Sequence, residues 1–198
     1  MTSRIPPAIA PFSGDVQGWL DRIMPAGVAP LVLFTTLARD QRLFQKLFAG
    51  GLVDRGHLTL RQREIVVDRT TALCHSEYEW GVHVSLFAKR VGFTEAQLYS
   101  LVHGDAEDAC WSEGEQFLIR MCDELHQTCS LSDPLWAGLR NEYSEEAMLE
   151  LLMLAGYYRT ISYLANALRL PLEAWGARFP LSGGPPEPGS DLAQISPV

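Results

Sequence analysis

The sequence has 198 residues, of which 47% are hydrophobic and 20% are charged, and this balance fits one globular domain with a short arm. Its formal net charge of −8 argues against a nucleic-acid partner, because phosphate binding needs a basic face. The four cysteines form neither a Cys-x-x-Cys pair nor a zinc-ligand spacing, which is typical of a reducing compartment. We therefore expect a cytoplasmic protein.

The first predicted elements are a Pro-rich arm and two helical segments. The first twelve residues carry several prolines where a signal peptide would need an unbroken apolar run. Residues 15–24 place apolar side chains at helical spacing and predict a short amphipathic helix. Residues 30–51 predict one or two further helices, which end at Gly50 and Gly51.

Capping boxes mark the starts of the next helices. A Ser or Thr is followed three residues later by Gln or Glu at Thr59-Gln62, Thr94-Gln97 and Ser112-Glu115. After the first box, helical spacing of apolar residues continues to Val91, and Gly92 follows. One helix of this length is long for a globular protein, so we expect a break near residues 74–76.

The last predicted helices cover residues 132–143 and 144–170. The second is the most apolar part of the chain, but it carries Glu150 and Arg159. These charges favour a buried helix over a membrane span. From Leu181 the tail is rich in Pro, Gly and Ser, a composition that predicts flexibility or an arm lying on a neighbour.

The fold class that follows is all-α, because helical periodicity runs through the chain and no stretch alternates as a strand does. We predict helix pairs packed as a bundle. The chain divides into an N-terminal arm with a short helix (1–29), a helical domain (30–175) and a Pro/Gly-rich tail (176–198).

A group of polar residues follows the predicted break. Ser76, Glu79 and His83 are spaced three and four apart, so they share one helix face. Trp80 lies beside this face, and Glu64 reaches it if the two helical segments fold against each other at the break. Two carboxylates that flank a histidine, beside an indole, are typical of a proton-transfer site without a metal.

Other interpretations of these residues stay open at this point. A Glu and a His four apart are most often a solvated helix pair. Glu79 and His83, with His75 at the break, offer too few well-directed ligands to favour a metal. Tyr157, Tyr158 and Arg159 would suit a carboxylate-binding pocket, since Arg pairs with carboxylates bidentately, but their spacing alone favours core tyrosines and a buried ion pair.

Residues 58–102 carry a family resemblance. They contain an Arg-Glu pair, a small-residue helix, a Glu-x-x-x-His step, and then Ala, Gly and a Thr-capped helix, at Arg63, Glu64, Glu79, His83, Ala88, Gly92 and Thr94. This pattern resembles the carboxymuconolactone decarboxylase family, which also contains the alkyl hydroperoxidase D proteins. With the flanking segments, the resemblance covers most of residues 30–170 and is to a longer bacterial subgroup. It implies an alkyl hydroperoxidase D-like helical bundle and a homo-oligomer.

The resemblance offers two chemistries, and the residues favour one of them. The hydroperoxidase branch needs Cys-x-x-Cys with a histidine four residues later, but Ser76 and Glu79 occupy the two cysteine positions. A hydroxyl group cannot form the disulfide of that cycle, so we predict no dithiol-supported peroxide turnover. Two alternatives stay open. One is alkyl hydroperoxidase or peroxiredoxin-type antioxidant activity, which the family name suggests, and the other is a non-catalytic ligand-binding oligomer.

The decarboxylase branch implies acid/base chemistry without a cofactor or metal. The substrate would be a small lactone or keto carboxylic acid, and no nucleic acid or membrane partner is expected. The resemblance implies that the catalytic residues are His83, Glu79 and Glu64, and that the substrate-binding residues are Ser76, Trp80, Tyr157 and Arg159.

The N-terminal segment gives a second reason to expect self-association. Four large apolar side chains there are more than a small first segment can readily bury by itself, namely Trp19, Leu20, Phe44 and Phe48. We therefore expect the arm, or the helices that follow it, to cover a partner subunit.

Overall fold

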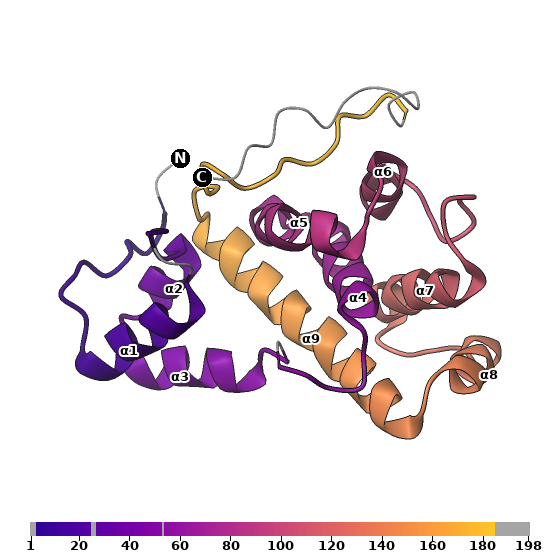
Figure 1. The fold of residues 1–198 in the computed structure, drawn as a ribbon, viewed down its shortest axis with the longest axis horizontal. Coiled ribbons are helices and arrows are strands. Elements are labelled where there is room, and N and C mark those ends of the chain that lie inside the picture. Colours follow the sequence, from indigo (N-terminus) through magenta and orange to yellow (C-terminus); the bar gives the residue numbers. More distant parts are fainter. Residues whose placement is uncertain (1–2, 25–26, 53, 185–198) are drawn as a thin grey trace.

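The computed structural model describes residues 3–24, 27–52 and 54–184. All regular elements in these residues are helices, which confirms the all-α prediction (Figure 1). In chain order they are α1 (Gly14–Ile23), α2 (Val32–Leu37), α3 (Gln41–Gly50), α4 (Leu60–Leu73), α5 (Glu77–Val91), α6 (Glu95–His103), α7 (Glu113–Thr128), α8 (Asp133–Glu142) and α9 (Glu145–Leu168).

The three predicted capping boxes begin α4, α6 and α7. In each box the third residue of the helix accepts a hydrogen bond from the backbone N–H of the cap residue, through Gln62, Gln97 and Glu115. These bonds satisfy a backbone donor that the first turn of a helix otherwise leaves without a partner.

The predicted break separates α4 from α5 at residues 74–76. His75 has a φ of 52°, a left-handed conformation that an α-helix cannot continue through. Beyond it, the Ser76 N–H donates to the Thr71 carbonyl at 2.8 Å. This short turn folds α5 back along α4, so the two helices are antiparallel neighbours.

Helix α4 lies at the centre of the molecule, in contact with α5, α6, α7 and α9 (Figure 1). Its residues 64–72 are all buried. A helix surrounded on all sides is expected to be apolar all round, yet Glu64, Asp68 and Arg69 lie in this stretch. Each of them therefore needs a partner inside the protein.

The N-terminal helices α1 to α3 pack on each other at one end of the molecule. Leu20 and Phe44 are fully buried there, and the Phe48 ring contacts those of Trp19 and Phe44. These side chains are covered largely within the chain, so they no longer provide a reason for self-association. The homo-oligomer itself stays a prediction.

The residues after α9 run back over α5. The Ala177 N–H donates to the Gly81 carbonyl at 3.0 Å, and the Phe179 ring packs on Trp80 with centroids 5.2 Å apart. At Gly81 a Cβ atom would collide with the Ala177 carbonyl oxygen, so this close approach requires glycine. In the predicted flexible tail, Ala177 and Phe179 therefore contact α5, Pro180 and Gly184 bond to side chains of α6, and residues 185–198 lie outside the described part.

Candidate acid–base site

The site is built on the facing sides of α4 and α5. Nδ1 of His83 lies 2.7 Å from Oε2 of Glu64, and Nε2 lies 3.5 Å from Oε1 of Glu79. On the other side of Glu64, the Arg63 Nε–H donates to Oε1 at 3.1 Å. The imidazole is thus held between two carboxylates, and only 7% of His83 is exposed.

The pKa of His83 follows from two opposed effects. Burial alone would lower it, because a low-dielectric interior disfavours the cation. The charge and hydrogen bond of Glu64, helped by Glu79, outweigh burial and raise the pKa of His83 to about 10. At neutral pH the ring is therefore an imidazolium, a loaded proton donor whose Nε2 points away from Glu64.

Glu79 lies in the first turn of α5, and Ser76 immediately precedes the helix as its N-cap residue. Both are buried, and Oε2 of Glu79 and Oγ of Ser76 have no hydrogen-bond partner among the described residues. Buried polar atoms in native proteins are nearly always paired. These two atoms are therefore exceptions to that rule, and both lie close to His83 in the sequence.

Sequence reasoning missed a third carboxyl group, Asp68, which is only 1% exposed. Its pKa is raised well above the usual value, first by burial and then by the charges of Glu64 and Glu79, which His83 partly offsets. The signal was available, because Asp68 follows Glu64 by four residues inside an apolar run and such spacing puts both on one helix face.

Two of the predicted substrate-binding residues have structural partners. Trp80 packs against Ala72, Val84 and Phe179, and its indole N–H has no partner among the described residues. The Tyr157 hydroxyl donates to the Leu47 carbonyl at 2.7 Å. It is the neighbouring Tyr158 whose ring meets His83 edge-on, with centroids 4.9 Å apart.

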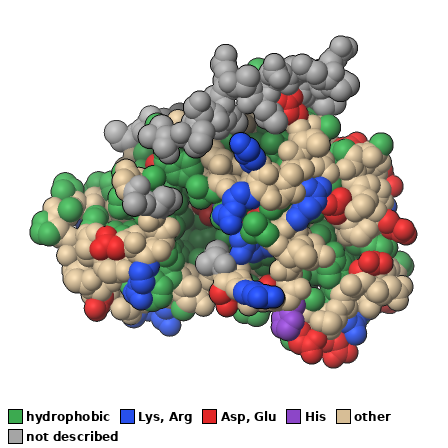
Figure 2. Space-filling view, viewed as in Figure 1, with side chains coloured by type: hydrophobic (Ala, Val, Ile, Leu, Met, Phe, Trp, Pro, Cys, Tyr) green, Lys and Arg blue, Asp and Glu red, His purple; other side chains and the backbone are tan. Residues whose placement is uncertain are grey.

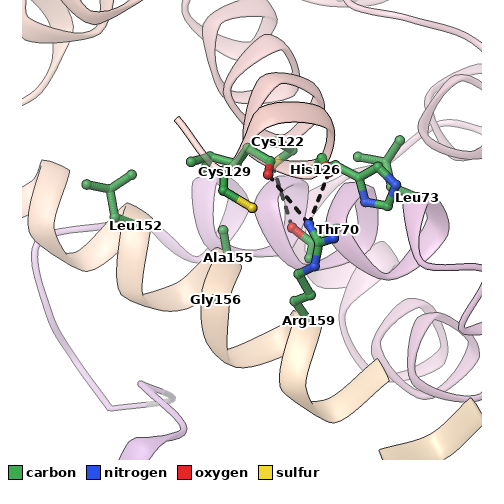
Figure 3. A pocket seen from close by; sticks show the side chains of 10 residues that line it. Thr70, Leu73, Cys122, His126, Cys129, Leu152, Ala155, Gly156 and Arg159 are labelled. Carbon is green, nitrogen blue, oxygen red and sulfur yellow. Dashed lines mark hydrogen bonds between the residues drawn. The ribbon is translucent and has the colours of Figure 1, made fainter. Parts of the chain in front are cut away.

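Arg159 lies away from His83, at a cavity of about 200 Å³ between α4, α7 and α9 (Figure 3). Its Nη1 is within hydrogen-bond reach of the Leu125 and His126 carbonyls at the end of α7, and its Nε–H donates to the Tyr163 hydroxyl. The lining residues are Thr70, Leu73, Cys122, Leu125, His126, Cys129, Leu152, Ala155, Gly156 and Arg159. None of the three predicted catalytic residues is among them.

The described part of the chain holds no group of three His, Cys, Asp or Glu side chains placed to bind a metal ion. No described helix combines the length and apolar character needed to cross a membrane. Burial raises the pKa of the Cys74 thiol, which disfavours the reactive thiolate.

The face in Figure 2 carries acidic side chains along the edge of α7 and α8, consistent with the net charge of −8.

We compared the sequence with protein families and curated proteins, and the fold with solved structures. The carboxymuconolactone decarboxylase family profile matches residues 41–118, while no curated protein matches the sequence. An uncharacterized peroxidase-related protein with an alkylhydroperoxidase AhpD core, from Ralstonia eutropha JMP134, superposes with a TM-score of 0.76 at 16% identity, over 87% of this chain and 93% of that one.

Two further solved structures share the fold. An uncharacterized peroxidase-related protein from Silicibacter sp. TM1040 has a TM-score of 0.76 at 12% identity, over 91% of this chain and 99% of that one. A cysteine-to-alanine variant of the debrominase Bmp8, in complex with 2,3,4-tribromopyrrole, has a TM-score of 0.71 at 14% identity, over 88% and 94%. At these identities the likeness establishes the fold alone.

Proposed function

We propose that this chain, whose residues 41–118 match the carboxymuconolactone decarboxylase family profile, performs cofactor-independent acid–base chemistry on a small lactone or keto carboxylic acid. One observation carries the proposal, namely the buried His83 imidazole held between Glu64 and Glu79. Enzymes commonly place a histidine in this way, with one carboxylate to orient the ring and stabilise its charge.

In the proposed decarboxylation the C–C bond to the carboxylate breaks and carbon dioxide leaves. The electron pair stays on carbon, delocalised into the neighbouring carbonyl group. The Nε2–H of the His83 imidazolium then protonates this carbon, while Glu64 keeps the ring in place through Nδ1. Because Glu79 would repel a second carboxylate, the carbonyl end of the substrate faces Glu79 and Ser76 in this proposal.

Among the four predicted substrate-binding residues, Ser76 has the strongest support for direct contact. Its hydroxyl group shares the helix face of Glu79 and His83 and has no partner among the described residues. Trp80, Tyr157 and Arg159 contact other parts of the chain. We therefore propose that Trp80 and Tyr157 shape the walls behind the site, that Arg159 has no direct contact with the substrate, and that Ser76 donates to the substrate carbonyl oxygen.

The test is a screen of lactone and keto acids for carbon dioxide release, followed by His83→Ala. A positioned acid–base group contributes about 10²–10⁴-fold, so turnover in His83→Ala should fall by that factor while the fold is kept. His126→Ala is the matched control, because this imidazole lines the other cavity, and its turnover should stay at the wild-type level. Equal losses in both variants, or none in His83→Ala, would refute the proposal.

The peroxidase alternative draws on the names of the structural neighbours. It requires a peroxidatic thiolate, and among the described cysteines the pKa values of Cys74, Cys110 and Cys122 are all raised, chiefly by burial. Organic hydroperoxide reduction that disappears in Cys74→Ser would favour this alternative over ours.

We also propose that the chain forms a homo-oligomer through α9. Leu149, Met153 and Tyr163 are 58% to 64% exposed, and their spacing places them along one side of the helix. Exposed apolar stripes of this kind mark contact surfaces. Light scattering that gives only the 22.0 kDa monomer at micromolar concentration would contradict self-association.

A further inference from the structure

The starting point is the burial of Asp68 in the centre of the molecule. Its side chain is shielded by the helices around α4, and Oδ1 has no hydrogen-bond partner among the described residues. An ionised carboxylate in such a place would lose its hydration without compensation. The usual outcome is that the group takes up a proton and stays neutral.

The register of the α4–α5 hairpin places Asp68 next to the site. His83 contacts Glu64, and nearer the turn the Ser76 N–H bonds to the Thr71 carbonyl. The loop at residues 74–76 joins the two helices. Four residues closer to this loop than Glu64, α4 carries Asp68, and four residues closer to it than His83, α5 carries Glu79. Asp68 and Glu79 therefore lie at the same level of the hairpin, one helical turn nearer the loop than His83.

The unpaired polar atoms gather at this level. They are Oδ1 of Asp68, Oε2 of Glu79 and, one turn further, Oγ of Ser76, and they come from the facing sides of the two helices. The Trp80 indole N–H also lacks a partner, but its ring packs toward α6 and the C-terminal segment. Among these three residues, Glu79 is the one that also contacts the imidazole, because its Oε1 lies 3.5 Å from Nε2 of His83.

The charges around Asp68 agree with a neutral acid. Glu64 and Arg63 approach from α4, Glu79 and His83 from α5, and Tyr158 packs on the imidazole from α9. The residues of α6 and α7 on this side engage Arg69, which pairs with Asp123 at 2.7 Å. The cluster holds three carboxyl groups, at Glu64, Asp68 and Glu79, but only two cationic side chains, Arg63 and His83, so three carboxylates would lack one counter-ion.

We propose that Asp68 is the proton store of this site, a carboxylic acid that returns a proton to His83 through Glu79 after each turnover. The inference rests on the proposed function for the identity of the proton acceptor. The burial and neighbours of Asp68, which raise its pKa, are properties of the free protein and can be tested alone. A carboxylic acid kept neutral by an apolar site has known precedent in catalysis.

The proton balance of this step is simple. After His83 has given its Nε2 proton to the substrate carbon, the O–H bond of Asp68 breaks and an O–H bond forms on Glu79. The Glu79 proton then moves to Nε2 of His83 and restores the imidazolium. Solvent returns one proton to Asp68, so that each carbon dioxide released consumes one proton. In this scheme Asp68 acts through Glu79 and is a positioning residue for the donor.

The protonation state of Asp68 is measured first, without any substrate. In protein labelled with ¹³C at the aspartate carboxyl groups, the other aspartates should have ionised by roughly pH 6, given an ordinary pKa near 3.9. One resonance with the shift of a protonated acid should persist at neutral pH and disappear in Asp68→Asn. Its absence from the wild-type spectrum would overturn the proposal, whether or not the variant folds.

The His83 titration gives a second readout. Asparagine is neutral, as protonated Asp68 is, so the pKa of His83 should be the same in Asp68→Asn and in the wild type. If Asp68 were ionised, the variant would lose a negative neighbour and the pKa of His83 would fall. Asp21→Asn on α1, where the carboxylate is exposed, is the matched carboxyl-to-amide control.

Kinetic measurements distinguish a proton-store role of Asp68 from a purely structural role. With an active substrate, Asp68→Asn should lower kcat by about tenfold or more, leave KM unchanged, and shift the alkaline limb of the pH–rate profile to lower pH. A loss of stability with an unaltered profile would overturn the store. If Asp68 proves protonated and no acid substrate is turned over, the proposed function fails, and the store fails with it.

Discussion

Charged side chains have different surroundings on the two sides of α4. On the α5 side, Glu64, Asp68, Glu79 and His83 are buried together, and Oδ1 of Asp68 and Oε2 of Glu79 have no partner among the described residues. On the α7–α9 side, the Arg159 guanidinium is bound by the carbonyl groups that end α7 and by a tyrosine hydroxyl. Charge alone therefore does not mark a functional site. A functional site is better indicated by buried polar groups that lack hydrogen-bond partners and lie next to a group with a strongly shifted pKa.

The largest effect expected from this contrast is on the pH dependence of stability. The pKa of His83 rises from its unfolded value near 6.5 to about 10 in the fold. Its contribution to the free energy of unfolding is therefore complete below about pH 6.5 and is lost as pH rises through about 10. The loss should reach at most roughly 5 kcal/mol, measured by urea unfolding at several pH values.

Glu64→Gln is the control for this pH dependence of the free energy of unfolding. It removes the charge that raises the pKa of His83, so the loss of stability over this pH window should largely vanish. A slope that is equally steep in the variant would assign the effect to other groups and remove the contrast between the two sides of α4.

A smaller effect is expected on the other side of α4. Arg159→Leu removes the hydrogen bonds to the end of α7 and to Tyr163, and should lower the free energy of unfolding by about 1–2 kcal/mol. The pKa of His83 should not change, because the two groups lie on different sides of α4. A shifted His83 titration in this variant would show that the two regions form one coupled site.

Sequence reasoning located the helices well because their signals are local. The capping boxes and the break at residues 74–76 depend on residues within one or two turns. The same holds for Glu79 and His83, which share a helix face by spacing alone, and the hairpin then delivers Glu64 to them. Asp68 was missed although it has the same local signal, since nothing in a single helix says that all its sides are buried.

The remaining site residues depended on tertiary packing. Tyr157, Tyr158 and Arg159 are consecutive on α9, so they point in different directions around the helix. The way α9 lies against α4 and α5 decides that Tyr158 meets His83, while Arg159 meets the end of α7. No periodicity in the sequence encodes that rotation, and the assignment of Arg159 to substrate binding depended on its residue type and on the family resemblance.

The central claim is that His83 is a buried imidazolium held by Glu64, and its NMR titration tests this most directly. With ¹⁵N-labelled histidine, the His83 ring should stay protonated at neutral pH and titrate near the expected pKa of about 10. In Glu64→Gln it should lose its proton at much lower pH, because burial then acts unopposed. A ring that titrates near 6.5 in the wild type and is indifferent to Glu64→Gln would contradict the account.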